Sequence, residues 1–138
     1  MYIINDKIYE GDIIMELYDY LLGLINAKPA PVVICDLNYR IIFMNDHAKK
    51  AYAKYGGENL MGQLLYNHCG LEAKTKIDMI IEWFKENKDR NSIFGYHDDE
   101  QNADIYIVAI RDKNKDLIGF TSMHELRTPD STPEYQLD

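Results

Sequence analysis

The sequence has little cysteine, no long apolar run and a shortage of positive charge. Two cysteines in 138 residues, Cys35 and Cys69, make no disulfide framework, so we expect a reducing, cytoplasmic setting. No apolar stretch approaches the roughly 18 residues that a membrane-spanning helix needs, and no leader pattern follows Met1. Fifteen Lys and Arg against 23 Asp and Glu leave a net charge of -8. This balance argues against nucleic acid and against a membrane surface as the main partner.

The composition and the length predict one folded domain. Hydrophobic residues make up 46% of the chain and charged residues 28%, which is enough apolar surface for a core. We expect an N-terminal arm over residues 1–11, a single domain over 12–127 and a flexible C-terminal tail over 128–138. The arm alternates loosely and could form a short strand. The tail contains two prolines and little apolar content.

The first strong periodic pattern predicts a helix from Asp12 to Ala27. Its apolar residues recur three or four positions apart and form one stripe: Ile13, Ile14, Leu17, Leu21, Leu24 and Ile25. We expect Asp12 to cap the helix and Pro29 to end it, since proline cannot donate a backbone hydrogen bond. The stripe must be buried against its own domain or against a second chain, and both alternatives stay open.

Two short runs rich in β-branched residues, 32–35 and 40–44, predict a β-hairpin. The turn between them contains Asp36 and Asn38, residue types that tolerate unusual backbone angles. Asn45 is placed to cap the helix that follows.

This next helix is predicted to run from Asp46 to about Tyr55, where Gly56-Gly57 ends it. Short helical turns are expected from Leu60 to Tyr66. A longer helix is predicted to begin at Thr75, with Asp78 as its capping partner. Its apolar face consists of Ile77, Ile80, Ile81 and Phe84, with Trp83 at the edge.

The last third of the chain predicts three strands, at residues 92–96, 104–111 and 117–125. A polar loop over 112–116 joins the last two as a hairpin. The order of helix, two strands, helices and three strands indicates an α+β domain with an antiparallel sheet.

Several of these segments together resemble a PAS domain. The run Val32-Val33-Ile34-Cys35-Asp36 is followed by a turn and by Arg40-Ile41-Ile42-Phe43-Met44-Asn45, and later by Leu60-Met61-Gly62-Gln63-Leu64-Leu65. The closing hairpin Ile110-Arg111-Asp112 and Leu117-Ile118-Gly119-Phe120 is similar to that of PAS sensors. The turn glycine usual in that family is replaced by Asn38 in the first hairpin and by Lys115 or Asp116 in the second.

The resemblance implies a five-stranded antiparallel sheet in the order 2-1-5-4-3, with short helices on one face. It also implies a sensory role without catalysis, in which an unidentified small molecule binds between the sheet and the helices of residues 45–71. The signal would pass to a partner protein or to a homodimer formed through the N-terminal helix. An alternative is a ligand-free interaction module whose cavity is filled by large inward residues such as Phe43, Met44, Tyr96 and Phe120.

Strand alternation places three candidate ligand contacts on one face of the last strand. Phe120, Ser122 and His124 share that face, and the resemblance implies that it lines the cavity. The mixture of apolar walls and a few polar groups is typical of small-molecule sites. Three further candidates are Tyr52 and Tyr96, through their hydroxyls, and His68, in the segment that covers the cavity in the family.

The string His124-Glu125-Leu126-Arg127-Thr128-Pro129 resembles the phospho-acceptor box of histidine kinases, and His124 would then be the acceptor of a truncated kinase sensor. In that family the histidine lies on a long helix. Here the string continues a strand pattern that begins at Leu117, so we expect the likeness to be coincidental.

No catalytic motif and no metal-ligand spacing is recognisable in the sequence. His68-Cys69 are adjacent and cannot easily contact one metal ion, and His97 next to Asp98-Asp99-Glu100 is more typical of a solvated acidic loop. We therefore expect a protein that is not an enzyme and has no metal site, and the sequence identifies no cofactor.

Overall fold

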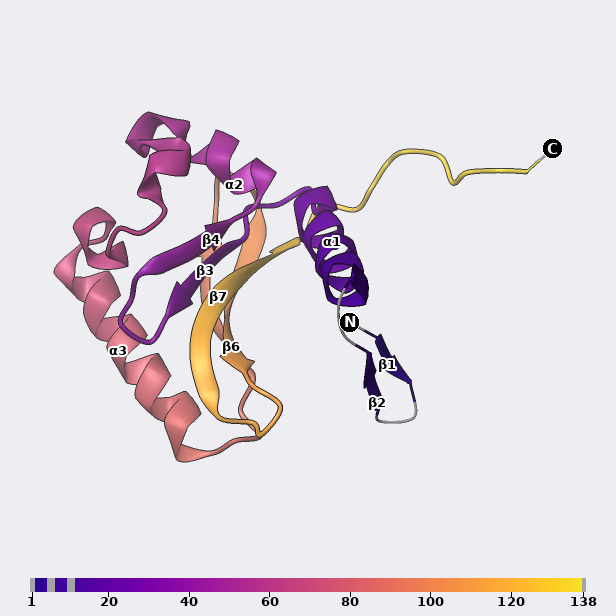
Figure 1. The fold of residues 1–138 in the computed structure, drawn as a ribbon. Coiled ribbons are helices and arrows are strands. Elements are labelled where there is room, and N and C mark those ends of the chain that lie inside the picture. The colour runs from indigo at the N-terminus through magenta and orange to yellow at the C-terminus, as the bar shows by residue number, and fades with distance from the viewer. Residues whose placement is uncertain (1, 5–6, 10–11, 138) are drawn as a thin grey trace. The chain divides into compact units, whose positions relative to one another are not determined.

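The computed structural model describes residues 2–4, 7–9 and 12–137 of the chain (Figure 1). The chain divides into two compact units, residues 1–69 and residues 70–138. A two-stranded sheet β1-β2 precedes a five-stranded antiparallel sheet in the order β4-β3-β7-β6-β5. Counted within the larger sheet, this order is 2-1-5-4-3. The α+β fold with that strand order, predicted from the sequence, is therefore confirmed.

The first unit begins with a small hairpin and one long helix. The hairpin pairs β1 (Tyr2–Ile4) with β2 (Lys7–Tyr9), where the sequence suggested one short strand or an ordered arm. Helix α1 spans Asp12–Ala27, with the bounds that the periodicity predicted. It ends two residues before Pro29, consistent with the missing donor of proline.

The second hairpin of this unit pairs β3 (Val33–Asp36) with β4 (Ile41–Met44). Asp36 holds the turn, because its Oδ1 accepts hydrogen bonds from the backbone amides of Asn38 and Arg40 at 2.9 and 3.0 Å. The prediction for the unusual backbone angle was wrong by one residue. The left-handed conformation falls on Tyr39, with φ of 64°, and not on Asn38.

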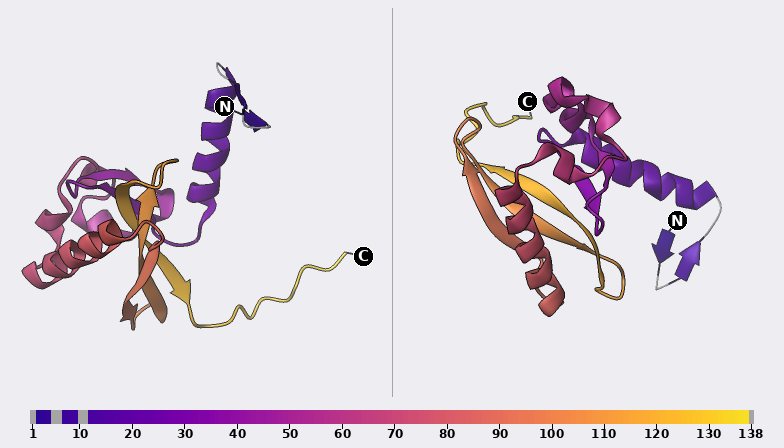
Figure 2. Two further views of the ribbon diagram at one scale, coloured as in Figure 1. Left: turned by 90° about the horizontal axis from the view of Figure 1, so that it is seen from below. Right: turned by 90° about the vertical axis from the view of Figure 1, so that its left-hand side faces the viewer.

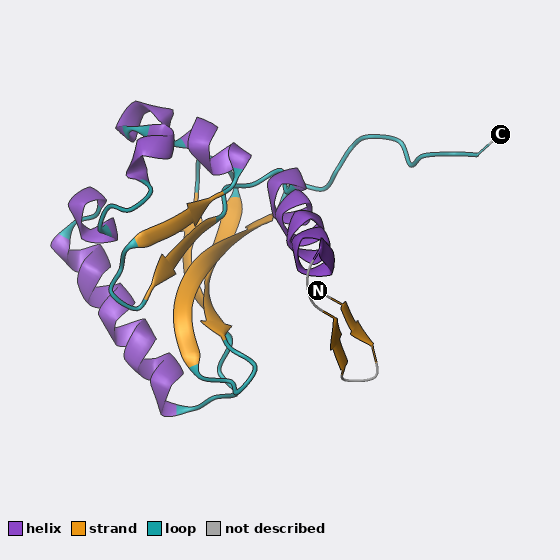
Figure 3. Ribbon diagram, in the orientation of Figure 1, coloured by secondary structure: helices purple, strands orange, loops and turns teal. Residues whose placement is uncertain are grey.

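The hairpin leads into a helix that is shorter than predicted (Figure 3). Helix α2 spans only Asp46–Ala51, and the 3₁₀ turns η1 (Ala53–Tyr55), η2 (Gly57–Leu60) and η3 (Leu65–His68) follow it. Asn45 caps α2 as expected, since its side chain accepts a hydrogen bond from the amide of Ala48. Gly56, with φ of 121°, supplies a conformation that other residues rarely adopt.

The described residues of the second unit, 70–137, form one helix and three strands, which Figure 2 shows from two further sides. Helix α3 spans Leu71–Glu86 and begins four residues before the predicted start. Thr75 does not cap it, because its hydroxyl donates to the carbonyl of Leu71 within the helix. Asp78 pairs with Lys74 at 3.2 Å instead of completing a capping box.

The strands of the second unit are β5 (Ser92–Asp98), β6 (Ala103–Arg111) and β7 (Leu117–Leu126). One face of this sheet forms the core with α3, and it holds the buried side chains of Ile105 and Phe120 together with Ile80, Ile81 and Phe84 of the helix. We call it the inner face and the opposite one the outer face. Gly95 marks a β-bulge where a Cβ atom would lie 3.0 Å from the carbonyl oxygen of Ile105.

Arg111, at the end of β6, joins the last turn of α3 to the closing hairpin. One guanidinium nitrogen donates to the carbonyls of Phe84, Asn87 and Arg90 at 2.8 to 3.2 Å. The other donates to the carbonyl of Lys115. A cation at this position is favourable because the carbonyl end of a helix carries a partial negative charge. Lys115 itself has a positive φ of 65°, as one of the two predicted replacements for the turn glycine.

Candidate functional site

Three of the predicted ligand contacts share the inner face of β7. Phe120 pairs with Ala109, Ser122 with Ile107 and His124 with Ile105 across the β6–β7 ladder. Residues directly opposite each other in an antiparallel pair point to the same face, so Ser122 and His124 lie on the face that carries the buried Ile105. Both polar side chains are half-buried. This row therefore presents one hydroxyl and one imidazole beside apolar groups.

Tyr96 extends this row across to the edge strand. It pairs with Ile105 after the bulge at Gly95, so Tyr96, Ile105 and His124 form one line across β5, β6 and β7. The Tyr96 side chain is 53% exposed, so it does not fill a closed core. Partial burial raises the pKa of its hydroxyl, and the charge of Asp98 adds to the effect. The hydroxyl accordingly stays protonated and can donate a hydrogen bond near neutral pH.

The other two candidates, Tyr52 and His68, belong to the first unit. Tyr52 is half-buried at the end of α2. His68 is exposed at the end of η3, and its Nε2 lies 2.8 Å from Oε1 of Gln63. The structure thus groups four of the six predicted site residues on one face of the second unit, and their part in ligand binding stays a prediction.

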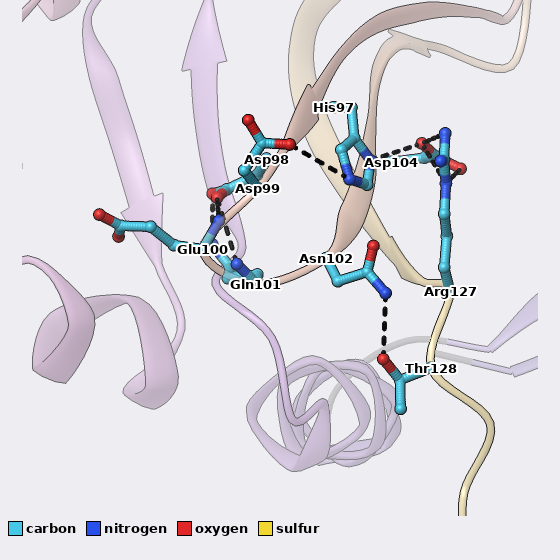
Figure 4. A network of polar contacts seen from close by, with 9 residues as sticks. All are labelled: His97, Asp98, Asp99, Glu100, Gln101, Asn102, Asp104, Arg127 and Thr128. Carbon is cyan, nitrogen blue, oxygen red and sulfur yellow. Dashed lines mark hydrogen bonds and ion pairs between the residues drawn. The ribbon is translucent and has the colours of Figure 1, made fainter.

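A polar cluster lies on the outer face of the second unit, centred on Asp104 (Figure 4). Arg127 donates hydrogen bonds to this carboxylate from both Nε and Nη2, at 2.6 to 3.0 Å. Nδ1 of His97 lies 3.0 Å from the same carboxylate, and Nε2 of His97 lies 3.7 Å from Asp99. Hydrogen bonding to Arg127, and to a smaller degree to His97, lowers the pKa of Asp104. The carboxylate is therefore charged throughout the neutral range.

The turn that joins β5 to β6 is held by its own side chains. Asp98 accepts hydrogen bonds from the backbone amides of Glu100 and Gln101 and from the side-chain amide of Gln101. Asn102 adopts a positive φ of 50° and donates from its side chain to the hydroxyl of Thr128 at 3.1 Å (Figure 4). The turn is thereby connected to the first residues after β7.

Sequence reasoning missed this cluster. It treated the acidic run after His97 as solvated, and Asp99 of that run is indeed 99% exposed, but it did not anticipate that Asp104, outside the run, lies 3.0 Å from the His97 ring. The β6–β7 register brings Asp104 opposite Glu125, two residues from Arg127, and only the register reveals this. The kinase-like string lies at the end of β7 and after it, with His124 inside the strand as expected, and not on a helix.

An open apolar groove of about 840 Å³ runs between α3 and β5. It contains none of the six predicted site residues. Its walls consist of Leu71, Glu72, Thr75, Lys76, Met79, Ile80, Trp83 and Ile93. Lys76 donates to the carbonyl of Gly95 beside it, which covers one backbone group of the edge strand.

Two further properties concern the part of the chain that the structure describes. No group of three or more His, Cys, Asp or Glu side chains there is arranged to hold a metal ion. None of the helices described is both long enough and apolar enough to cross a membrane.

Comparisons with known proteins agree on the fold. No protein-family model matches the sequence, and no curated protein matches it either. Among solved structures, a C-terminal domain from Streptococcus mutans is 14% identical, with a TM-score of 0.60 over 78% of this chain and 83% of that one. The PAS domain of a protein from Colwellia psychrerythraea is 18% identical, with a TM-score of 0.56 over 79% and 95%.

A third similar structure is the PAS domain of an HTR-like protein from Haloarcula marismortui. It is 13% identical and has a TM-score of 0.54 over 82% of this chain and 95% of that one. Identities this low show the fold alone, and two of these structures are PAS domains. Together with the strand order β4-β3-β7-β6-β5, they show that this chain has the fold of a PAS domain.

Proposed function

We propose that the protein is a sensory PAS domain that binds a small molecule against the inner face of its sheet and relays this event to a partner protein. The observation that carries the proposal is the row of Tyr96, Ile105 and His124 across three neighbouring strands. Ser122 lies on the same face, two residues before His124 in β7. Small-molecule sites combine apolar walls with a few polar groups that fix orientation, and this face offers that combination.

The chemistry of the face indicates the kind of ligand. The hydroxyls of Tyr96 and Ser122 donate or accept, and the imidazole of His124 does either according to its tautomer. Phe120 and Ile105 are buried and supply apolar contact. A flat or compact organic molecule with one or two polar atoms fits these groups better than a highly charged one does.

Binding can act on a partner only through a difference in affinity between two states of the domain. A ligand on the inner face would have different affinities for the two states if its contacts favour one arrangement of β7. Because the two cysteines of the chain, Cys35 and Cys69, are unpaired, we place this activity in the cytoplasm.

Nuclear magnetic resonance tests the site directly. A library of small aromatic and heterocyclic compounds is titrated into the ¹⁵N-labelled protein, and we expect the shifted amides to cluster on β5, β6 and β7 around His124. Ser122→Ala should weaken the best compound several-fold, which is the loss expected for one hydrogen bond. Met123→Leu is the matched control on the outer face and should leave the affinity unchanged. Equal losses in both variants, or shifts confined to other elements, would contradict the proposal.

Dimerisation through α1 is a second proposal with its own observation. Tyr20, Leu21 and Leu24 are 68%, 51% and 69% exposed and lie on one side of the helix. An apolar stripe of this kind favours a partner helix. Helix α1 contains acidic residues and no Lys or Arg, so the charged sides of two copies would repel each other. A second copy is therefore expected to pack against the apolar stripe.

Analytical ultracentrifugation tests the dimer with two variants that add the same charge. Leu24→Glu places the charge in the stripe and should produce a monomer. Gly23→Glu places it about 100° around α1 from Leu24, at a position where nothing lies within 4 Å of a new Cβ, and should disturb the dimer far less. A wild-type protein that stays monomeric when its concentration in the centrifuge is raised about 100-fold would contradict this second proposal.

A further inference from the structure

The residues just after β7 are held to the sheet by contacts that come from one short segment. The backbone amide of Arg127 donates to the carbonyl of Asn102 at 3.0 Å, and the side chain of Asn102 donates to Thr128. The Arg127 guanidinium binds Asp104, two residues farther along (Figure 4). We call these contacts of residues 102 and 104 with residues 127 and 128 the exit clamp, because the chain leaves the sheet at this point.

The same turn also contacts the inner face. Nδ1 of His124 lies 3.3 Å from Oε1 of Gln101, the residue that immediately precedes Asn102. The amide end of the Gln101 side chain is held by Asp98 at 2.8 Å, so its oxygen is oriented by the turn. His124 is therefore hydrogen-bonded to Gln101, and the peptide bond from Gln101 to Asn102 continues the connection to the exit clamp.

We propose that the turn of residues 98–102 is a latch that couples the inner face of the sheet to the exit of the chain. His124 stabilises the closed latch through Gln101, and the closed latch presents Asn102 to Arg127 and Thr128. The inference rests on the proposed function in one respect, namely that a ligand on the inner face would compete for His124.

The geometry favours coupling over independent contacts. Gln101 and Asn102 are neighbours in a turn, and Asn102 has a positive φ of 50°, a turn conformation that asparagine tolerates and that sets the direction of its carbonyl and side chain. Loss of the contact to His124 removes one of the groups that fix this turn. The carbonyl and the side chain of Asn102 then lose their alignment toward residues 127 and 128 together.

The Arg127 amide reports the state of the latch directly, because its hydrogen is the one donated to Asn102. We would measure its hydrogen exchange by nuclear magnetic resonance in the full chain without any ligand. Gln101→Ala and His124→Ala should each accelerate it about two- to tenfold, the range that one hydrogen bond in water supplies. Neither substitution is adjacent to Arg127 in sequence, so its intrinsic exchange rate does not change.

Two controls separate the latch from a general loss of stability. Glu100→Ala changes the same turn at a side chain that makes no bond among the residues drawn in Figure 4, and should leave the Arg127 rate unchanged. The Ala109 amide, bound to the carbonyl of Asn91 at the far end of the sheet, should keep its rate in every variant.

The double variant tests whether the two residues act through one contact. Gln101→Ala combined with His124→Ala should exchange no faster than the single variants, since the second substitution removes a contact already lost. Rates at Arg127 that stay within 1.5-fold of wild type in both single variants would overturn the proposal, and so would effects that multiply in the double variant. Failure to bind a small molecule would contradict the proposed function and leave these rates as they are.

Discussion

Replacement of Asn45 should be among the most destabilising polar substitutions in the protein. Its side chain is completely buried and makes four hydrogen bonds. Oδ1 accepts from the amides of Val32 and Ala48, both at 2.9 Å. Nδ2 donates to the carbonyls of Ile25 and Ala30, both at 3.0 Å. One amide side chain therefore joins the end of α1, the segment before β3 and the start of α2.

The magnitude follows from those four bonds. Each contributes about 1 kcal/mol net, and a partner left buried without a bond costs more. We expect Asn45→Ala to lower the free energy of unfolding by about 4 kcal/mol. Asn45→Ser keeps an oxygen that can cap α2 through Ala48, and should recover about 1 kcal/mol of this loss.

Urea unfolding, followed by circular dichroism, measures these values. With a slope of about 1.5 to 2 kcal/mol per molar urea, Asn45→Ala should move the midpoint down by about 2 M. Asn26→Ala is the matched control, because Asn26 is half-buried and accepts one bond, from the amide of Asp46 at 3.1 Å. It should cost about 1 kcal/mol. Equal losses in Asn45→Ala and Asn26→Ala would refute the reasoning.

Three further predictions concern packing, acid stability and thiol reactivity. Phe84→Ala, at a completely buried position, should cost about 3 to 5 kcal/mol in the same urea assay, and Met79→Ala, 69% exposed on the same helix, should cost far less. The pKa of Asp104 is lower in the folded state. The stabilisation of the fold by the charged carboxylate is therefore present above the ordinary pKa of 3.8 and is lost as the pH falls through the pKa of the folded state. Asp104→Asn should therefore be less stable than wild type at pH 7, with the gap closing below about pH 4, whereas a constant gap in acid unfolding titrations would contradict this. Burial raises the pKa of Cys35 to about 12, so native mass analysis after iodoacetamide treatment at pH 8 should show no label there, and labelling at the rate of a free thiol would disprove it.

Much of the fold could be predicted from the sequence because the local signals were strong and agreed with one another. The stripe of α1, the cap at Asn45 and the three strands of the last third each follow from short-range chemistry. The start of α3 was misplaced because Thr75 and Asp78 imitate a capping box. In the structure Gly70 precedes the helix and Thr75 bonds within it.

The candidate site divides in the same way. Alternation along β7 correctly placed Phe120, Ser122 and His124 on one face, since the period of a strand is fixed. The cluster around Asp104 could not be predicted in this way. It depends on which residues of β5, β6 and β7 are opposite each other, and a bulge in β5 shifts that register.

The measurement that tests the central claim most directly is native mass spectrometry of the freshly purified protein, compared with its denatured mass. We expect a mass in excess of the chain that is lost on denaturation, and we expect that excess to diminish in Ser122→Ala but not in Met123→Leu. The bare chain mass in the native state, unchanged after exposure to the compound library, would contradict small-molecule sensing.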